Sequence, residues 1–204
     1  AKDVRRGAAR KIVCAVSFVV LFLMFALRHP SMGVDLGYGK STGYLAWFRR
    51  IARFTWADTL TSKVVNYERG YVIFNKLISL VSDDYQWFLA MCAMAALLLI
   101  IWTIYKKCYY PDLAIYIFMG LPTFLMLFSG IRQSIAIAIC FWAIQYIEEK
   151  KLYKFIAIVL FAMTFHKTAW VFLFAYPIYY FPMRRSWRTF TYLVIPLVYI
   201  FRYP

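Results

Sequence analysis

The sequence predicts an all-α fold, a polytopic transmembrane helix bundle, and three observations support it. Hydrophobic residues make up 64% of the 204 residues and mean hydropathy is +0.63, whereas soluble domains lie nearer half apolar. The apolar residues form about seven segments, several of them near the roughly 20 residues that cross a bilayer. Lys and Arg collect at alternate ends of these segments, as the orientation of membrane helices requires.

The formal charge of +15 would suggest a nucleic-acid partner for a soluble chain. Here the cations flank apolar segments, so we expect no nucleic acid and instead contact with anionic membrane lipids. The four cysteines are Cys14, Cys92, Cys108 and Cys140. They have no CxxC spacing, so we expect packing roles, with no metal site, no disulfide framework and no cofactor.

The first apolar segment, 12–27, follows a basic stretch at 1–11. It lacks a small-x-small cleavage site, so we expect a retained anchor rather than a signal peptide. A polar and aromatic section, 28–86, comes next. The remainder, 87–204, is expected to hold spans at 87–105, 109–128 and 131–147, two that share 152–181, and one from near Phe190. We treat 1–204 as a single membrane domain.

A cytoplasmic N-terminus gives the most consistent distribution of charge. The inside segments then contain Lys2, Arg5, Arg6, Arg10, Lys11, Lys106, Lys107, Lys150, Lys151, Lys154, Arg184, Arg185 and Arg188. The short outer turns contain only Arg132 and Lys167. Section 28–86 carries further basic residues, but long loops translocate with little regard to charge. We therefore predict a multi-pass protein with 1–11 in the cytoplasm and 28–86 outside.

The stretch between Lys154 and Arg184 is shorter than the roughly 40 residues that two full crossings need. Either one long helix spans here, which breaks the charge rule, or the hairpin that turns at His166 is recessed below the outer surface. We favour the recessed hairpin. Non-helical backbone at such depth is tolerated only against protein or a watery cavity.

Two amphipathic helices are expected in the outer section, both lying on the membrane. In the first, one face carries Tyr44, Leu45, Phe48, Ile51 and Ala52, and the other carries Arg49, Arg50 and Arg53. The second opens at Glu68-Arg69-Gly70-Tyr71 and has Ile73, Phe74, Leu77, Ile78 and Val81 as its apolar residues. Asp83 and Asp84 then precede the second span and are suited to cap its N-terminus.

Four residues from separate parts of the chain fall on the outer side: Asp35, Glu68, Arg132 and His166. Arg132 begins a predicted helix, where free backbone N–H groups and a guanidinium together suit a phosphate. The alternative is that Arg132 extends to lipid headgroups. This convergence is the main functional indication that the residues give.

His166 can act as a base near neutral pH, and the adjacent Lys167 would favour its neutral form. The alternative is a structural histidine at a helix break. Glu68 and Asp35 lie in a section rich in Tyr and Trp, a combination that suits sugar rings, although aromatic residues also belong at membrane interfaces. No Gly-rich phosphate loop, Walker-type motif or GxSxG elbow was recognised. Without a nucleotide site, an activated donor would have to be lipid-linked.

Four motifs in order resemble the EpsG-type family of Wzy-like exopolysaccharide and O-antigen polymerases. They are Asp35-Leu36-Gly37-Tyr38, Glu68-Arg69-Gly70-Tyr71, Ser129-Gly130-Ile131-Arg132-Gln133 and Phe165-His166-Lys167-Thr168. The resemblance implies a bacterial plasma-membrane enzyme that joins oligosaccharide repeats carried on undecaprenyl diphosphate, at the outer face, for capsule, biofilm or other exopolysaccharide. Polysaccharide-assembly proteins are expected as partners. Family members are usually longer, so we expect a truncated sequence.

Carried onto these motifs, the resemblance implies that Arg132 stabilises the leaving diphosphate and that His166 or Glu68 accepts the hydroxyl proton. Asp35 would orient sugar hydroxyls. The remaining motif residues expected to bind substrate are Tyr38, Arg69, Tyr71, Gln133 and Lys167.

Two other functions compete. A membrane acyltransferase that modifies extracellular polysaccharide would use His166 as base, but the sequence shows no acid partner beside it. A transporter or flippase of lipid-linked sugars would favour paired ionisable groups near mid-bilayer. Only His166 and Lys167 pair in this way, and they lie toward the outer side.

Overall fold

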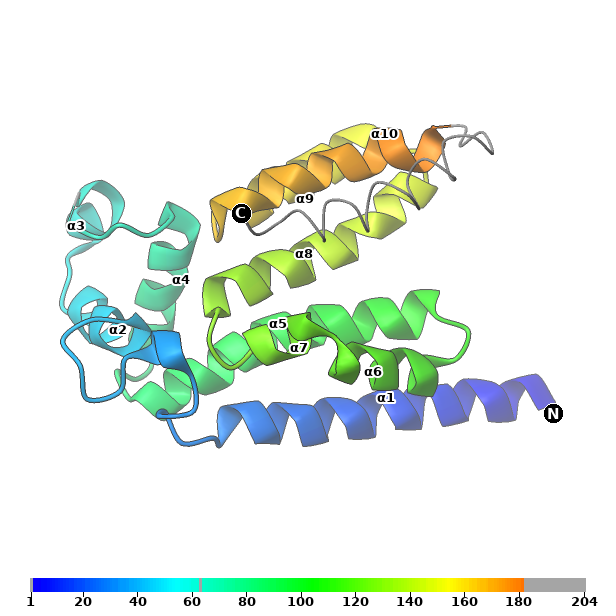
Figure 1. The fold of residues 1–204 in the computed structure, drawn as a ribbon, viewed down its shortest axis with the longest axis horizontal. Coiled ribbons are helices and arrows are strands. Elements are labelled where there is room, and N and C mark those ends of the chain that lie inside the picture. Colours follow the sequence, from blue (N-terminus) through cyan, green and yellow to red (C-terminus); the bar gives the residue numbers. More distant parts are fainter. Residues whose placement is uncertain (1, 63, 182–204) are drawn as a thin grey trace, which may run out of the picture. The chain divides into compact units, whose positions relative to one another are not determined.

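The computed structural model describes residues 2–62 and 64–181, which form helices and no strand (Figure 1). The helices of the first compact unit, Ala1–Leu173, are α1 (Lys2–Ala26), η1 (Val34–Leu36), α2 (Tyr44–Ala52), α3 (Trp56–Thr61), α4 (Arg69–Ser79), α5 (Tyr85–Lys107), α6 (Pro111–Gly120), α7 (Pro122–Met126), α8 (Ile131–Glu148), α9 (Leu152–Met163) and the start of η2 (Lys167–Phe174). The second unit, Phe174–Pro204, contains α10 (Ala175–Tyr180). The segment predicted from near Phe190 lies outside the described residues.

Two described helices are long and apolar enough to cross a bilayer, and they match the first two predicted spans. Gly7–Ala26 has a mean hydropathy of 2.1, and Tyr85–Lys107 has one of 2.4. Asp84 caps the second helix as expected, because its carboxylate accepts hydrogen bonds from the N–H groups of Gln86 (2.6 Å) and Trp87 (3.3 Å).

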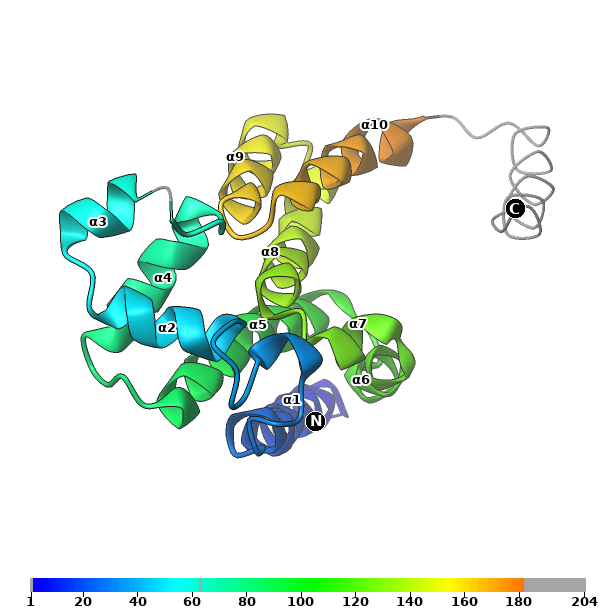
Figure 2. The ribbon, with the colours of Figure 1, turned by 60° about the vertical axis from the view of Figure 1, so that its left-hand side comes forward.

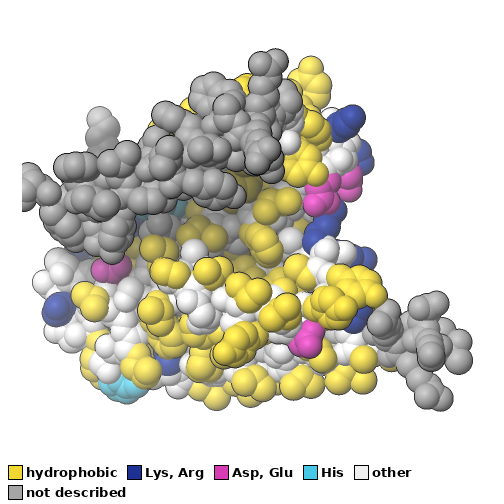
Figure 3. Space-filling model, turned by 45° about the vertical axis from the view of Figure 1, so that its right-hand side comes forward, with side chains coloured by type: hydrophobic (Ala, Val, Ile, Leu, Met, Phe, Trp, Pro, Cys, Tyr) yellow, Lys and Arg dark blue, Asp and Glu magenta, His cyan; other side chains and the backbone are white. Residues whose placement is uncertain are grey.

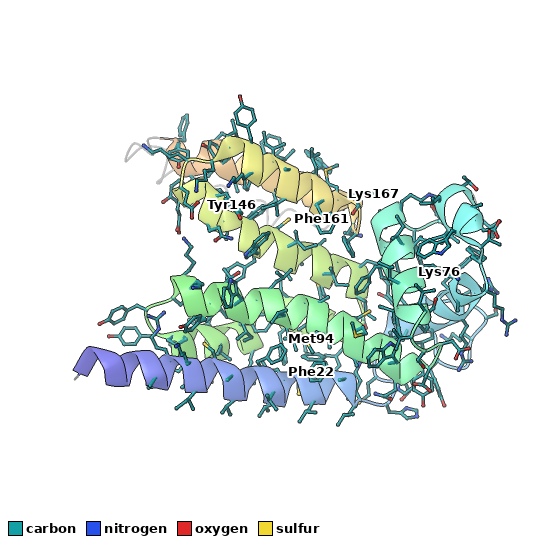
Figure 4. The ribbon with its side chains drawn as sticks, turned by 180° about the vertical axis from the view of Figure 1, so that it is seen from behind. Phe22, Lys76, Met94, Tyr146, Phe161 and Lys167 are labelled. Carbon is teal, nitrogen blue, oxygen red and sulfur yellow. The ribbon has the colours of Figure 1, made fainter. Side chains whose placement is uncertain are left out.

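These two long helices, α1 and α5, pack side by side and run in opposite directions (Figures 1 and 4). Near the start of α1, Arg10 donates to the carbonyl oxygens of Tyr105 (2.7 Å) and Cys108 (2.9 Å), at the end of α5. At the other end, the Gln86 amide donates to the carbonyl of Ala26. Arg10 thus satisfies helix-end carbonyls, where a cation is also favoured by the helix dipole.

Helix α8 packs against both α5 and α9 (Figure 2). Lys107, at the end of α5, forms an ion pair with Glu148 at the end of α8, with 2.5 Å between Nζ and Oε2. In the tight turn into α9, Lys150 has a left-handed backbone (φ 56°) and Lys151 donates its N–H to the Tyr146 carbonyl (2.8 Å). The basic helix ends therefore gather at one end of the first unit.

The predicted span 109–128 is not one continuous helix. It is divided into α6 and α7 at Leu121, whose backbone is extended (φ −84°, ψ 147°). The cause is Pro122, which has no N–H to donate and sterically disfavours a helical conformation in the preceding residue. Together the two pieces are shorter than an uninterrupted crossing helix.

Section 28–86 contains the expected helices, and much of their apolar surface packs against other helices of the protein. In α2, Tyr44, Leu45, Phe48 and Ile51 are buried, against α4 and α5. The Phe48 ring stacks on Phe88, with 4.7 Å between centroids. In α4 the buried residues differ in part from the predicted apolar face. Leu77 is exposed, as is Val81 just after the helix, whereas the buried residues are Tyr71, Val72, Asn75, Lys76 and Ile78.

A lysine explains part of that difference. The Lys76 ammonium donates to the Ala52 carbonyl (2.9 Å) at the end of α2, so it is buried because it binds the neighbouring helix end (Figure 4). The periodicity of α4 alone cannot reveal such a partner.

Helix α9 has 12 residues and rises about 18 Å, less than the roughly 30 Å hydrocarbon core. The turn at His166 follows it directly, so no single long helix runs through this stretch, and the recessed hairpin stays a prediction. Exposed apolar side chains also suit a lipid surround. Along α1 they include Ile12, Val16, Val19, Val20 and Leu23. In the view of Figure 3, hydrophobic side chains cover much of the lower part of the surface, where α1 lies.

Candidate active site

Arg132 lies in the first turn of α8, at the end of the first unit opposite the basic helix ends. Its guanidinium forms an ion pair with Glu68 through Nη1, and its Nε donates to the Tyr44 hydroxyl (3.3 Å). The side chain is 19% exposed and that of Glu68 is 17% exposed. Arg132 is therefore held by protein groups in a half-buried site and does not simply extend toward headgroups.

Three tyrosines surround the guanidinium. Its central carbon lies 4.3 Å from the ring centroid of Tyr67, 5.7 Å from that of Tyr44 and 6.0 Å from that of Tyr71. The rings also pack on one another, with centroids 5.6 to 5.8 Å apart. Burial raises the pKa of Tyr67 to about 12, so this ring stays neutral and presents a π face to the cation.

Glu68 joins the two residues suspected from the sequence. One carboxylate oxygen, Oε2, binds Arg132, and the other, Oε1, accepts the backbone N–H of Lys167 (3.0 Å) and lies 3.6 Å from Nδ1 of His166. Burial alone would raise the pKa of Glu68, but the Lys167 N–H and the Arg132 guanidinium outweigh it and lower that pKa below its usual value. Glu68 is therefore ionised and committed to protein partners.

His166 lies in the turn after α9 with a side chain that is 20% exposed. Burial lowers its pKa below 6.5; the Glu68 carboxylate opposes this shift, and the Arg132 and Lys167 charges add to it. The imidazole is thus neutral near pH 7. Its Nδ1 is buried and has no hydrogen-bond partner among the described residues, and the Glu68 carboxylate lies 3.6 Å away. A proton on Nδ1 would leave the Nε2 lone pair free.

Close backbone packing brings Glu68 and His166 together. The N–H of Tyr71 donates to the Thr164 carbonyl (3.1 Å), so the first turn of α4 rests on the end of α9. Figure 4 shows Lys167 where α9 ends beside α4. At Gly70 an added Cβ would lie 2.1 Å from the Thr164 hydroxyl oxygen and 2.8 Å from its carbonyl oxygen. Only glycine permits this approach.

The loop that carries Asp35 is attached to the turn that precedes α8. The Val34 N–H donates to the Ser129 hydroxyl (3.0 Å). Nearby, buried Arg28 donates to the Leu127 carbonyl (2.9 Å), and its guanidinium lies 5.1 Å from the Phe128 ring centroid. These contacts place Asp35 and Arg132 on the same cleft, which has a volume of about 400 Å³.

Of the other residues expected to bind substrate, some lie in the site and others lie away from it. Tyr71 is in the site, but its ring is fully buried, so it supports Arg132 rather than reaching a ligand. Tyr38 lies apart, packed edge-on against His29 and Tyr85. Arg69 points to the end of α3, where it donates to the Ser62 carbonyl (2.6 Å).

Gln133 is half-buried beside Gly130 and lies outside the cleft lining. Lys167 contributes its backbone N–H to Glu68, while its side chain is exposed. Tyr38 and Arg69 therefore lie outside the cleft lining, and their contact with substrate stays a prediction.

Tyr44 and Tyr67 are the residues that sequence reasoning did not assign to the site. Tyr44 was placed on a lipid-facing helix surface and Tyr67 among interfacial aromatics. Aromatic residues make up 21% of the chain, and unlike Tyr38 and Tyr71 neither of these rings lies in one of the four motifs, so the sequence does not distinguish them. Among the described residues, no group of three or more His, Cys, Asp or Glu could hold a metal ion.

A comparison with models of protein families confirms the family that the four motifs resemble. The model of the EpsG family matches residues 11–204. The chain belongs to the EpsG family. No curated protein and no solved structure matches it. EpsG membership together with two long apolar helices indicates a membrane protein and suggests a polysaccharide polymerase-like function.

Within this EpsG chain, all four motifs quoted from the sequence contribute to one region. Glu68, Arg132 and His166 come from three of them, and Glu68 lies next to each of the other two, while Asp35 comes from the remaining motif and lines the adjoining cleft. Residues separated by up to 99 positions are in contact here. The region combines a cation, a neutral imidazole and carboxylates, which is suited to acid–base and anion-stabilising chemistry.

Proposed function

We propose that the protein is a glycosyltransferase that polymerises oligosaccharide repeat units linked to undecaprenyl diphosphate. It would act at the outer face of the bacterial plasma membrane, as a multi-pass protein with a cytoplasmic N-terminus. The observation that carries this proposal is the meeting of Arg132, Glu68 and His166. EpsG membership supports a polysaccharide polymerase-like function, and the grouping of the basic helix ends away from this site supports the orientation.

In the proposed reaction, a sugar hydroxyl of one lipid-linked unit attacks the anomeric carbon of the growing chain. A new glycosidic C–O bond forms, and the bond from that carbon to the diphosphate oxygen breaks. The hydroxyl proton passes to a protein base, and undecaprenyl diphosphate leaves with the bonding electrons. The protein must therefore provide a base for the hydroxyl and a cation for the diphosphate.

His166 is the better candidate for the base. Glu68 already binds Arg132 and the Lys167 N–H, and its lowered pKa makes it a weak proton acceptor near pH 7. His166 is neutral there, and its Nδ1 faces Glu68. We assign proton acceptance to Nε2 of His166, positioning to Glu68, diphosphate stabilisation to Arg132, and contact with sugar hydroxyls to Asp35.

Acyl transfer to polysaccharide remains a second candidate because of one observation. No acid partner for His166 is evident from its neighbours in sequence, whereas in the structure the Glu68 carboxylate lies 3.6 Å from its Nδ1. A histidine oriented by a carboxylate would serve as a base for either reaction. Cells fed labelled acetate distinguish the two, since only an acyltransferase would place the label in the polymer as an acyl group.

Reconstitution tests the polymerase directly. Purified protein in liposomes is supplied with lipid-linked repeat units, and the products are resolved by length. We expect ladders of polymer, lost in His166→Gln and strongly reduced in Arg132→Lys, because lysine keeps the charge but lacks the bidentate fork. Translocated single units without a ladder would instead identify a flippase, and full polymer from both variants would refute the assigned roles.

A further inference from the structure

We propose that the cleft beside Arg132 binds the diphosphate of the lipid-linked sugar, and that Lys40 is the second cation of this site. The inference rests on the proposed function and deepens it, because it locates the part of the substrate that would leave. Lys40 itself was assigned no role from the sequence, although the motif Asp35-Leu36-Gly37-Tyr38 lies just before it.

The cleft has the composition of an anion site with a sugar-compatible edge. Its volume is about 400 Å³, and its lining residues are Val34, Asp35, Gly37, Lys40, Thr42, Gly43, Tyr44, Tyr67 and Arg132. Two cations, Lys40 and Arg132, share the lining with one acid, Asp35. A diphosphate carries at least two negative charges, which matches two cations better than one.

Three glycines shape the loop that carries Lys40. Gly37, Gly39 and Gly43 all have positive φ, at 65°, 73° and 106°, a region that side-chain-bearing residues rarely adopt. The loop is also closed at its base. A Cβ on Gly37 would lie 1.9 Å from the Thr42 carbonyl oxygen, and one on Gly43 would lie 2.7 Å from the Gly37 Cα. This closure gives Lys40 a defined place on the cleft wall.

Contacts outside the loop fix it against the rest of the site. Arg50 donates to the Ser41 carbonyl (3.1 Å), and the Val34 N–H donates to Ser129, near the start of α8. Helix α2 begins on the cleft wall, since Gly43 and Tyr44 both line it, and no side chain caps its first turn. Backbone donors at such a helix start add to the positive potential of the two cations.

Arg132 retains a free donor for a ligand. Its Nε is used by Tyr44 and its Nη1 by Glu68, whereas Nη2 donates to no protein atom among the described residues. The Lys40 ammonium likewise has no protein acceptor in the part of the chain that the structure describes, where its backbone N–H alone binds Gly37. Both cations are therefore available to phosphate oxygens.

Asp35 sets the direction in which the substrate would lie. Its carboxylate repels phosphate but accepts hydrogen bonds from sugar hydroxyls. The phosphates are therefore expected between Lys40 and Arg132, with the sugar toward Asp35. This arrangement leaves the anomeric carbon, the junction of the two parts, inside the cleft.

Binding of farnesyl diphosphate to the full chain in nanodiscs tests the site without requiring polymerisation. We expect Lys40→Ala to weaken binding about tenfold, the loss of one charge-assisted hydrogen bond, and Lys40→Arg to retain it. Arg49→Ala is the matched control, because it removes one exposed positive charge of the outer section away from the cleft. Binding should also weaken as salt is raised.

Equal binding by wild type and Lys40→Ala would overturn the inference, even if the wild type polymerises lipid-linked units. A second arm replaces phosphatidylcholine by phosphatidylglycerol in the nanodiscs. If phosphatidylglycerol abolishes farnesyl diphosphate binding in a Lys40-dependent way, the cleft is a lipid-headgroup site and the inference is wrong. If diphosphate binding depends on Lys40 but no polymer ever forms, the proposed function fails and the site stands.

Discussion

At the scale of single residues, Glu68 determines how the site works. It is ionised, it holds Arg132 and the Lys167 N–H, and its nearest further neighbour is Nδ1 of His166. In the proposed mechanism this carboxylate would hold the cation and face the base, and proton acceptance falls to His166 rather than to Glu68.

The first prediction concerns pH. The pKa of His166 lies below 6.5 because of burial, so in the folded protein the imidazole stays neutral to a lower pH than in the unfolded chain. The contribution to stability is complete above pH 6.5 and is lost as the pH falls through the folded value. We expect the acid limb of polymerisation rate against pH to lie below 6.5.

The variant Glu68→Gln sharpens this prediction. It removes the carboxylate that raises the pKa of His166, so the acid limb should move to still lower pH. His166→Gln should remove the limb and cost roughly 10²- to 10⁴-fold in rate, the usual range for a general base. An acid limb that is the same in wild type and Glu68→Gln would contradict the pairing.

At the scale of elements, the contact of α4 with the end of α9 assembles the site. We expect Gly70→Ala to destabilise the protein by about 1–3 kcal/mol, as overpacking does, because the new Cβ meets the Thr164 hydroxyl and carbonyl oxygens. Polymer formation should fall with it. Gly120→Ala is the control, since a Cβ there has no neighbour within 4 Å. Thermal unfolding in detergent measures the stability of both variants. Equal losses of stability in Gly70→Ala and Gly120→Ala would contradict the role of the close approach at Gly70.

A second prediction at this scale concerns the start of α5. Asp84→Ala should cost about 0.5–2 kcal/mol, the usual range for a lost N-cap, because two N–H groups lose their acceptor. Asp83→Ala removes an adjacent acid that caps no helix and should have little effect. Chemical unfolding of the two variants compares them, and similar stability would rule out capping by Asp84.

The elements that the sequence predicted well are those whose signals are local. The starts of α5 and α8 follow from Asp84 and Gly130, and the amphipathic pattern located α2. The predictions were wrong or incomplete for residues whose burial or contacts depend on a partner distant in sequence. Nothing near Lys76 in sequence indicates the Ala52 carbonyl, and nothing near Tyr67 indicates that its ring faces Arg132. Pro122 lies inside the predicted span 109–128, and the prediction of one span there did not allow for the helix break that this proline causes.

At the scale of the whole molecule, alternating charges predicted which helix ends lie together, because ends on one membrane side share a charge bias. In the described part of the chain, Arg10, Lys107 and Lys151 gather at one end, and the candidate site lies at the other. The convergence of Asp35, Glu68, Arg132 and His166 followed from that topology alone. Their actual contacts required the fold, because they depend on the approach at Gly70.

Labelling tests this arrangement in cells. In a background lacking native cysteines, Ser41→Cys should react with a membrane-impermeant maleimide from outside, whereas Lys154→Cys should react only after permeabilisation. Both positions are exposed, so reactivity reports the side of the membrane rather than burial. Reaction of both from the same side would contradict the proposed orientation.

The pairing of α1 with α5 also bears on biogenesis. Arg10 contacts carbonyls 95 and 98 positions further along the chain. Only 17% of the apolar stretch of α1 is buried inside the protein, against 56% of that of α5. During synthesis α1 emerges long before its partner exists. It must therefore enter the bilayer on its own hydrophobicity, and it acquires the neighbour that completes its hydrogen bonds only after section 28–86 has been made.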